Sequence, residues 1–192
     1  MPSPYAINFH PSPLPDGRGP YPMVRAILEA RQQWAVSCHI VADAFDEGDI
    51  LAVEPFALAT DESLESLSLK VQMAARRLAL RVATADFAAL WQHAQVQGVG
   101  HYWPLWTDAE RQLDFAQPVA RLLRQIRAFS WLETRAVVNG MPLFVRRAVG
   151  WCELHTHRLG SVVYCTPNTV VVAVSDGYLG LIDTTSHSML MS

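Results

Sequence analysis

The amino-acid sequence predicts an α/β fold followed by a small β-domain, and three observations support this. Short apolar runs at residues 5–9, 34–41 and 50–56 have the length of strands. Residues 62–93 repeat apolar side chains at helical spacing. From Ala136 onward, apolar residues alternate with period two between turn residues. The 192 residues, 51% of them apolar, suffice for packed cores in one or two domains.

The first strand leads into Asn8 and His10, which lie two positions apart and therefore project from the same face. Pro11, Pro13 and Pro15 end the strand and stiffen the turn that follows. A carboxamide and an imidazole fixed side by side are suited to polarising a carbonyl oxygen. The alternative is that both side chains only satisfy backbone groups at the strand end.

Two helices are expected in the first part of the chain. The shorter one covers residues 21–31, where Pro22 suits the first turn. The longer one covers residues 62–93, and Thr60 or Asp61 can cap it.

The predicted strands at 34–41 and 50–56 are joined by residues 42–49, a loop that carries four carboxylates. A charged loop of this kind is normally a solvated surface, so the pattern alone leaves its role open.

A connecting segment at residues 101–117 divides the chain into a first domain, residues 1–100, and a second domain, residues 118–192. The second domain opens with a helix that reaches Phe129. Six short runs with strand character follow, separated by turn residues. This pitch of strands and turns indicates a small β-barrel or sandwich.

The net charge of −3 gives no reason to expect a general polyanion binder. Residues 1–116 hold 8 Lys and Arg against 14 Asp and Glu, a balance of −6, while residues 117–192 hold 7 against 4, a balance of +3. The mildly basic second part tolerates a phosphate-bearing partner without requiring one. The 3 cysteines have no CxxC spacing, which predicts reduced thiols and a cytoplasmic protein. No apolar run approaches the roughly 20 residues of a membrane span.

No metal site is predicted. Cys152, His155, His157 and Cys165 do not have the spacing of a zinc site. Ser12 is not surrounded by a Gly-x-Ser-x-Gly turn, so a serine nucleophile is not expected.

Several spaced motifs run through the chain. They are Asn8-Phe9-His10-Pro11-Ser12-Pro13-Leu14-Pro15, Arg18-Gly19, Phe45-Asp46-Glu47-Gly48-Asp49-Ile50 and His101-Tyr102-Trp103-Pro104. Together they resemble the signature of the formyltransferase family that uses 10-formyltetrahydrofolate. The resemblance implies the C-terminal part of a Rossmann-like formyltransferase domain, followed by an OB-like β-barrel.

By this resemblance Asn8, His10 and Asp46 form the catalytic trio, and the spacing favours Asp46 over Asp49. An amine would attack the formyl carbon of 10-formyltetrahydrofolate. Asn8 and a protonated His10 would stabilise the negative oxygen, while Asp46 would keep His10 charged and accept the amine proton.

The resemblance also implies residues that contact the folate or the acceptor: Ser12, Leu14, Pro15, Arg18, Gly19, Asp43 and Phe45. Ser12 is expected to act mainly by shaping the turn. Arg18 either pairs near the site or lies at the surface. The acceptor implied by the resemblance is methionyl-tRNA, an amino sugar nucleotide or a similar amine. Phe129-Ser130-Trp131-Leu132 departs from the Asn-Pro-Trp-Pro of tRNA-formylating members, which weakens the assignment to tRNA.

In the family, the first half of the catalytic domain precedes the Asn-x-His strand, whereas here that strand starts at residue 5. An internal strand that lacks a neighbour has an exposed edge. If the chain is complete, we expect a homodimer or a partner chain at this edge. The alternatives are a fragment of a longer enzyme, one half of a split enzyme, or a truncated, non-catalytic binding module.

Overall fold

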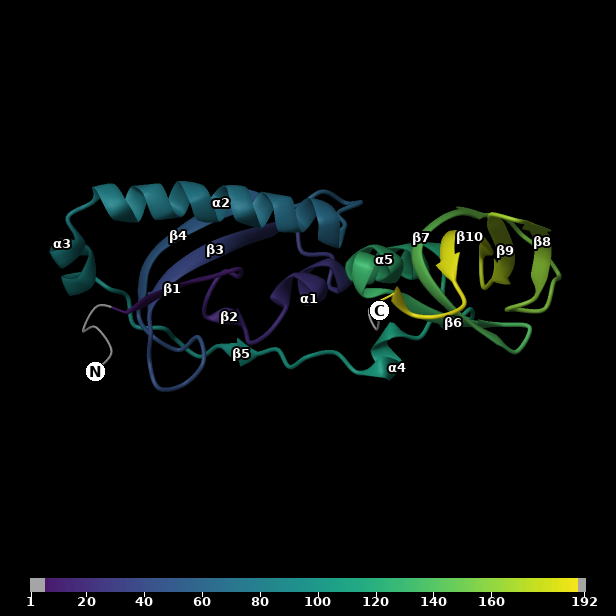
Figure 1. Ribbon diagram of the computed structural model, residues 1–192, viewed down its shortest axis with the longest axis horizontal. Helices are drawn as coiled ribbons and strands as arrows, with labels where there is room; N and C mark the ends of the chain where they lie inside the picture. Colours follow the sequence, from purple (N-terminus) through teal and green to yellow (C-terminus); the bar gives the residue numbers. More distant parts are fainter. Residues whose placement is uncertain (1–5, 190–192) are drawn as a thin grey trace. The chain divides into compact units, whose positions relative to one another are not determined.

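The computed structural model describes residues 6–189, which form two compact units (Figure 1). The first unit consists of the residues up to Thr60 together with Ser66–Leu105. The second consists of Asp61–Glu65 and the residues from Trp106 onward. Each unit has its own sheet and hydrophobic core, and the expected α/β class is confirmed. Within residues 6–189, no helix combines the length and apolar character needed to cross a membrane.

The main sheet of the first unit is antiparallel. Its strands, in spatial order, are β1 (Ile7–His10), β3 (Gln33–Ile40) and β4 (Ile50–Ala57). The register of β1 and β3 places Asn8 opposite His39, and His10 opposite Ser37. Because side chains alternate between the two faces of a sheet, these four polar residues share one face.

The other face of this sheet is apolar, and α2 (Leu64–Thr84) covers it. Val36 and Cys38 of β3 pack there with Ala74 and Leu78 of the helix. Figure 1 shows α2 running along β3 and β4. Because α2 covers the apolar face, the polar residues Asn8 and His10 lie on the opposite face, which α2 does not cover.

The helices of the first unit are shorter than predicted. Residues 62–93 form two helices, α2 and α3 (Phe87–Gln92), because Asp86 starts a new helix by accepting a hydrogen bond from the Ala89 N–H. The predicted helix at 21–31 is α1 (Pro22–Leu28). Ala30 follows it with a left-handed φ of 53°, which turns the chain towards β3.

The proline turn after β1 is fastened to the segment that leaves α3. β2 (Asp16–Arg18) pairs in parallel with β5 (His101–Tyr102), and both strands are too short for the sequence pattern to reveal. The Trp103 N–H donates to the Arg18 carbonyl oxygen at 2.7 Å. A Cβ at Gly19 would lie 2.6 Å from the Trp103 carbonyl oxygen, and the φ of 102° there favours glycine. The turn therefore holds a fixed position beside the polar face.

The second unit contains one antiparallel sheet with strand order β6-β7-β10-β9-β8. Its elements are α4 (Asp108–Arg111), α5 (Val119–Phe129), the 3-10 helix η1 (Ser130–Leu132), β6 (Thr134–Val138), β7 (Met141–Cys152), β8 (Val162–Thr166), β9 (Thr169–Val174) and β10 (Gly177–Thr185). Leu122 and Ile126 of α5 pack with Val172 and Leu179 of the sheet. Two of the predicted runs merge into the single strand β7.

Candidate active site

The structure brings Asn8, His10 and Asp46 together at the polar face of the first sheet. The first two belong to β1, and Asp46 lies in the loop between β3 and β4. The His10 Nδ1 atom is 3.3 Å from Asp46 Oδ1, and these side chains are only 7% and 12% exposed. Their shielding from water strengthens the electrostatic coupling between them.

His39 is a fourth member of this cluster that sequence reasoning did not single out. Its Nδ1 atom lies 2.7 Å from the Ile40 carbonyl oxygen, which can only accept, so Nδ1 carries the proton. Its Nε2 atom then accepts from Asn8 Nδ2 at 3.2 Å and lies 3.6 Å from Asp46 Oδ1. Only the register of β1 against β3 reveals His39, because that register places it opposite Asn8.

His10 has an acceptor at each ring nitrogen. Nε2 lies 2.8 Å from the Gly17 carbonyl oxygen, and Nδ1 faces Asp46. Burial lowers the pKa of His10 below its ordinary 6.5, although the Gly17 carbonyl and the Asp46 carboxylate act in the opposite direction and His39 adds to the lowering. That Asp46 keeps His10 charged stays a prediction, because the carboxylate favours the imidazolium while burial opposes it. A proton on each ring nitrogen would find an acceptor in place, the Gly17 carbonyl oxygen at Nε2 and Asp46 at Nδ1.

Asp46 is held on both of its carboxylate oxygens. Oδ1 faces the two imidazoles, and Oδ2 accepts a hydrogen bond from the Gly19 N–H at 3.0 Å. Gly19 thus orients the carboxylate through its backbone.

Ser12, Leu14 and Pro15 build the turn. The buried Ser12 hydroxyl donates to the Asp16 carbonyl oxygen at 2.8 Å, consistent with a turn-shaping role. The Leu14 side chain is buried, and its N–H donates to Ser37 Oγ at 3.1 Å. Pro15 lies so close to Gly100 that a Cβ there would be 2.2 Å from the Pro15 carbonyl oxygen. Ser12, Leu14 and Pro15 therefore fix the turn that lies beside the site.

Asp43 and Phe45 belong to the loop that carries Asp46, and Arg18 contacts this loop through Glu47. Arg18 donates to Gln97 Oε1 and to Glu47 Oε1, so its guanidinium is engaged by the protein. Asp43 is exposed, and Phe45 is 84% exposed. An exposed phenyl ring at the edge of a polar site offers a surface against which a flat ring can stack.

A cavity of about 380 Å³ opens beside His10 and Asp46. Gly19, Phe45 and Tyr102 are among the residues that line it. Tyr102 was not singled out from the sequence, and it reaches this place because β5 pairs with β2. The cavity combines an apolar lining with a coupled acid and base, which is the combination expected of a small-molecule site.

The residues checked for a metal site do not form one in the described part of the chain, where no group of three His, Cys, Asp or Glu side chains could hold an ion. His155 Nε2 is taken up by the Val174 and Gly177 carbonyl oxygens, at 2.7 and 3.0 Å. Cys152 Sγ lies 3.7 Å from Asp176 Oδ2.

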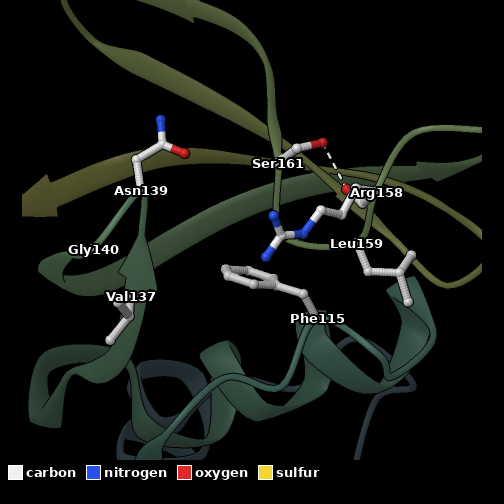
Figure 2. A pocket seen from close by; sticks show the side chains of 8 residues that line it. Phe115, Val137, Asn139, Gly140, Arg158, Leu159 and Ser161 are labelled. Atoms are coloured by element: carbon white, nitrogen blue, oxygen red, sulfur yellow. Dashed lines mark hydrogen bonds between the residues drawn. The ribbon is translucent and has the colours of Figure 1, made fainter.

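A second cavity, of about 410 Å³, lies in the second unit and contains none of the predicted site residues. Figure 2 shows the Arg158 guanidinium beside the Phe115 ring, with Asn139 on the opposite wall. No coupled pair of an acid and a base lines it, so it lacks the chemistry found at the first cavity.

Comparisons with known proteins point to one family. A family model described as formyl transferase matches residues 1–83, and one described as formyl transferase, C-terminal domain, matches residues 106–188. Methionyl-tRNA formyltransferase of Roseiflexus castenholzii is 28% identical over 177 residues, covering 91% of this chain and 56% of the relative. The enzyme of that name from Caulobacter vibrioides is 30% identical over 182 residues, covering 92% of this chain and 58% of the relative. The chain thus spans little more than half the length of these relatives.

Solved structures share the fold. HypX from Aquifex aeolicus in complex with tetrahydrofolic acid matches 91% of this chain and 31% of its own, with a TM-score of 0.71 and 22% identity. An N-formyltransferase from Helicobacter canadensis, in complex with folinic acid and dTDP-3-aminofucose, matches 93% of this chain and 66% of its own, with a TM-score of 0.68 and 15% identity.

Proposed function

The chain belongs to the formyl transferase family, and on that premise we propose that it carries the catalytic centre for formyl transfer from 10-formyltetrahydrofolate to an amine. The observation that carries this proposal is the convergence of Asn8, His10 and Asp46 at one face of the sheet, where His10 and Asp46 line a cavity and Asn8 contacts His39. These are the residue types that amide chemistry needs: a donor for the carbonyl oxygen and a coupled pair that can take a proton.

In the proposed reaction, the amine lone pair forms a bond to the formyl carbon, and the carbonyl electron pair moves onto oxygen. The Asn8 amide nitrogen has two hydrogens, of which one is directed to His39 Nε2. The second donates to the negative oxygen of the tetrahedral intermediate.

The attacking nitrogen loses its proton to Asp46, and His10 Nδ1, 3.3 Å away, shares it. A neutral His10 is suited to this step, because the imidazolium that forms has the Gly17 carbonyl and Asp46 as acceptors. The electron pair on oxygen then re-forms the carbonyl, and the bond from carbon to N10 breaks with its electron pair going to N10. That nitrogen takes the proton from the pair, which releases tetrahydrofolate and the N-formyl product.

Calorimetric titration with 5-formyltetrahydrofolate, a non-reactive analogue of the donor, tests whether the chain alone contains the folate site. We expect binding by the parent chain, weaker binding by Asp46→Ala, and parental binding by Asp49→Asn, which changes a carboxylate of the same loop. No detectable binding by the parent chain would rule out that it acts as an autonomous enzyme.

We propose methionyl-tRNA as the first acceptor to be tested. The relatives of that name match more than nine tenths of this chain, and residues 117–192 have a balance of +3. The Helicobacter canadensis structure contains an amino sugar nucleotide, which makes such compounds the second class to be tested. Formylation assayed with both acceptors in parallel distinguishes the two.

The edge of β1 supports a second proposal, that this chain works with a complementing strand from another copy or another chain. Among residues 6–189, β1 pairs with β3 alone. A strand edge with unpaired backbone groups recruits a further strand. Static light scattering should reveal a dimer or a complex, whereas a monomer that binds no apolar dye would contradict this proposal.

The alternative of a non-catalytic binding module predicts folate binding without formyl transfer to either acceptor.

A further inference from the structure

Gln97 lies in the segment after α3 and connects the Asp46 loop to the proline turn. Its Nε2 atom donates to the Asp46 carbonyl oxygen at 2.8 Å and to the Gly48 carbonyl oxygen at 2.7 Å. Its Oε1 atom accepts from Arg18, at 3.1 Å from Nε and 2.8 Å from Nη2. One amide side chain thus makes four hydrogen bonds to two separate segments.

The orientation of this amide is fixed by its partners. Arg18 can only donate, so the atom that faces it must be the amide oxygen. The two carbonyl oxygens can only accept, so the atom that faces them must be the amide nitrogen. Arg18 also donates to Glu47 Oε1 at 3.2 Å, which ties a further loop residue to the same assembly.

The loop needs such an anchor because Asp46 has a left-handed φ of 58°. This conformation is uncommon for a residue with a side chain, although Asp is one of the types that adopt it, and contacts to the neighbouring backbone favour it. The path next to it is also tight, since a Cβ at Gly48 would lie 1.8 Å from the Ile40 carbonyl oxygen. Gln97 holds the carbonyl of the strained residue, while the carboxylate of that residue is turned towards His10 and Gly19.

We propose that Gln97 is a positioning residue, which with Arg18 holds the Asp46 loop in the conformation that presents the carboxylate to His10. This role deepens the proposed formyl-transfer function and rests on it. Gln97 acts through the backbone of Asp46. Its own amide is fully hydrogen-bonded to the loop and to Arg18 of the turn.

The protonation of His10 measures this role without any substrate. The groups that face His10 are Asp46 and the Gly17 carbonyl, which raise its pKa, and His39, which lowers it. If Gln97 no longer holds the loop, the carboxylate moves away and the pKa of His10 falls further. The reference for complete loss of the carboxylate charge is Asp46→Asn.

The experiment is an NMR titration of the His10 imidazole in the full chain. Gln97→Met keeps the length of the side chain and removes all four hydrogen bonds. We expect it to shift the midpoint downwards by at least half of the shift that Asp46→Asn causes. Gln97→Leu, which also removes all four hydrogen bonds and adds no charge, should shift it in the same direction. Gln95→Met is the matched control in the same segment and should keep the parental midpoint.

A parental His10 midpoint in folded Gln97→Met and Gln97→Leu would overturn the proposal. Loss of the fold in both variants would also overturn it, because a residue that only fixes the loop leaves the core between α2 and the sheet intact. Absence of formyl transfer by the parent chain would count against the proposed function alone, since the titration needs no catalysis. The two failures are therefore distinguishable.

Discussion

The two units bury their polar groups in different ways. In the first unit, the shielded His10 and Asp46 face each other beside a cavity. In the second unit, the buried carboxylate of Glu133 accepts from Ser188 Oγ at 2.6 Å and from the Met189 N–H at 3.2 Å. A carboxylate whose oxygens accept hydrogen bonds from donors fixed in the fold has a structural role. One that faces a second titratable group and a cavity can exchange a proton.

The same contrast holds for the two sheets. The first sheet has one face covered by α2 and one polar face that bears Asn8 and His10. The second sheet closes its inner face with α5 and with apolar residues such as Val172 and Leu179. We therefore expect substitutions in the first unit to change chemistry and substitutions in the core of the second to change stability.

The largest effect is expected for Asp46→Asn, which keeps the shape of the side chain and removes its proton-accepting charge. In a formyl-transfer assay with 10-formyltetrahydrofolate and methionyl-tRNA, kcat should fall by about 10²–10⁴, the usual contribution of a general base. Asp49→Asn, in the same loop, should retain the parental kcat. Equal losses in both variants would show that the loop contributes only its overall charge.

Asn8→Ala should lower kcat by about 10²–10³, because it removes a donor to the oxygen that becomes negative. The Asn8 side chain is exposed and its contact in the sheet is with His39, so the unfolding temperature should change little. Steady-state kinetics and thermal unfolding, measured on one preparation, check both parts. A large loss of stability with unchanged kcat would assign Asn8 to the structure instead.

Leu179→Ala tests whether the second unit is a stability element. Its side chain is fully buried in the core beside Leu122, so truncation should cost about 3 kcal/mol of unfolding free energy. Val137→Ala, at a side chain that is 52% exposed in the same sheet, should cost much less. Chemical denaturation measures both, and the His10 titration midpoint should remain parental. A shifted midpoint in Leu179→Ala would contradict the separation of roles.

Local signals made much of the molecule predictable. The Asn8–Pro15 turn, the Asp46 loop and the period of two after Ala136 all lie in short stretches of sequence, and each corresponds to an element of the structure. The turn at Asn139-Gly140 has φ values of 50° and 78°, the left-handed pair that such dipeptides favour in hairpins.

The remaining features depend on long-range pairing, which no local pattern contains. His39 joins the site only through the register of β1 against β3, and Gln97 reaches Asp46 across 51 positions of sequence. Arg146 and Arg147 lie between the two predicted runs that form the single strand β7. Arg146 is accommodated in the strand by its pairing with Asp183, 2.6 Å away.

The smallest expected effect is on the pH dependence of stability, and it distinguishes burial from ion pairing at His10. Burial lowers the pKa of His10 in the folded chain below its ordinary 6.5. The unfolded state then binds more protons as the pH falls below 6.5, so the stabilisation from a neutral His10 is present above that pH and is lost towards the folded pKa. Each unit by which the pKa is lowered corresponds to about 1.4 kcal/mol.

Denaturation of the parent and His10→Gln chains across this pH range should therefore give a shallower loss of stability for the variant, which has no group to titrate at this position. Asp46→Asn should steepen the loss, because it removes a charge that raises the pKa of His10. A shallower loss of stability in His10→Gln together with a steeper loss in Asp46→Asn would show that desolvation has a larger effect on the pKa of His10 than the ion pair with Asp46. If Asp46→Asn instead flattened the profile, the ion pair would dominate and His10 would be charged in the resting site.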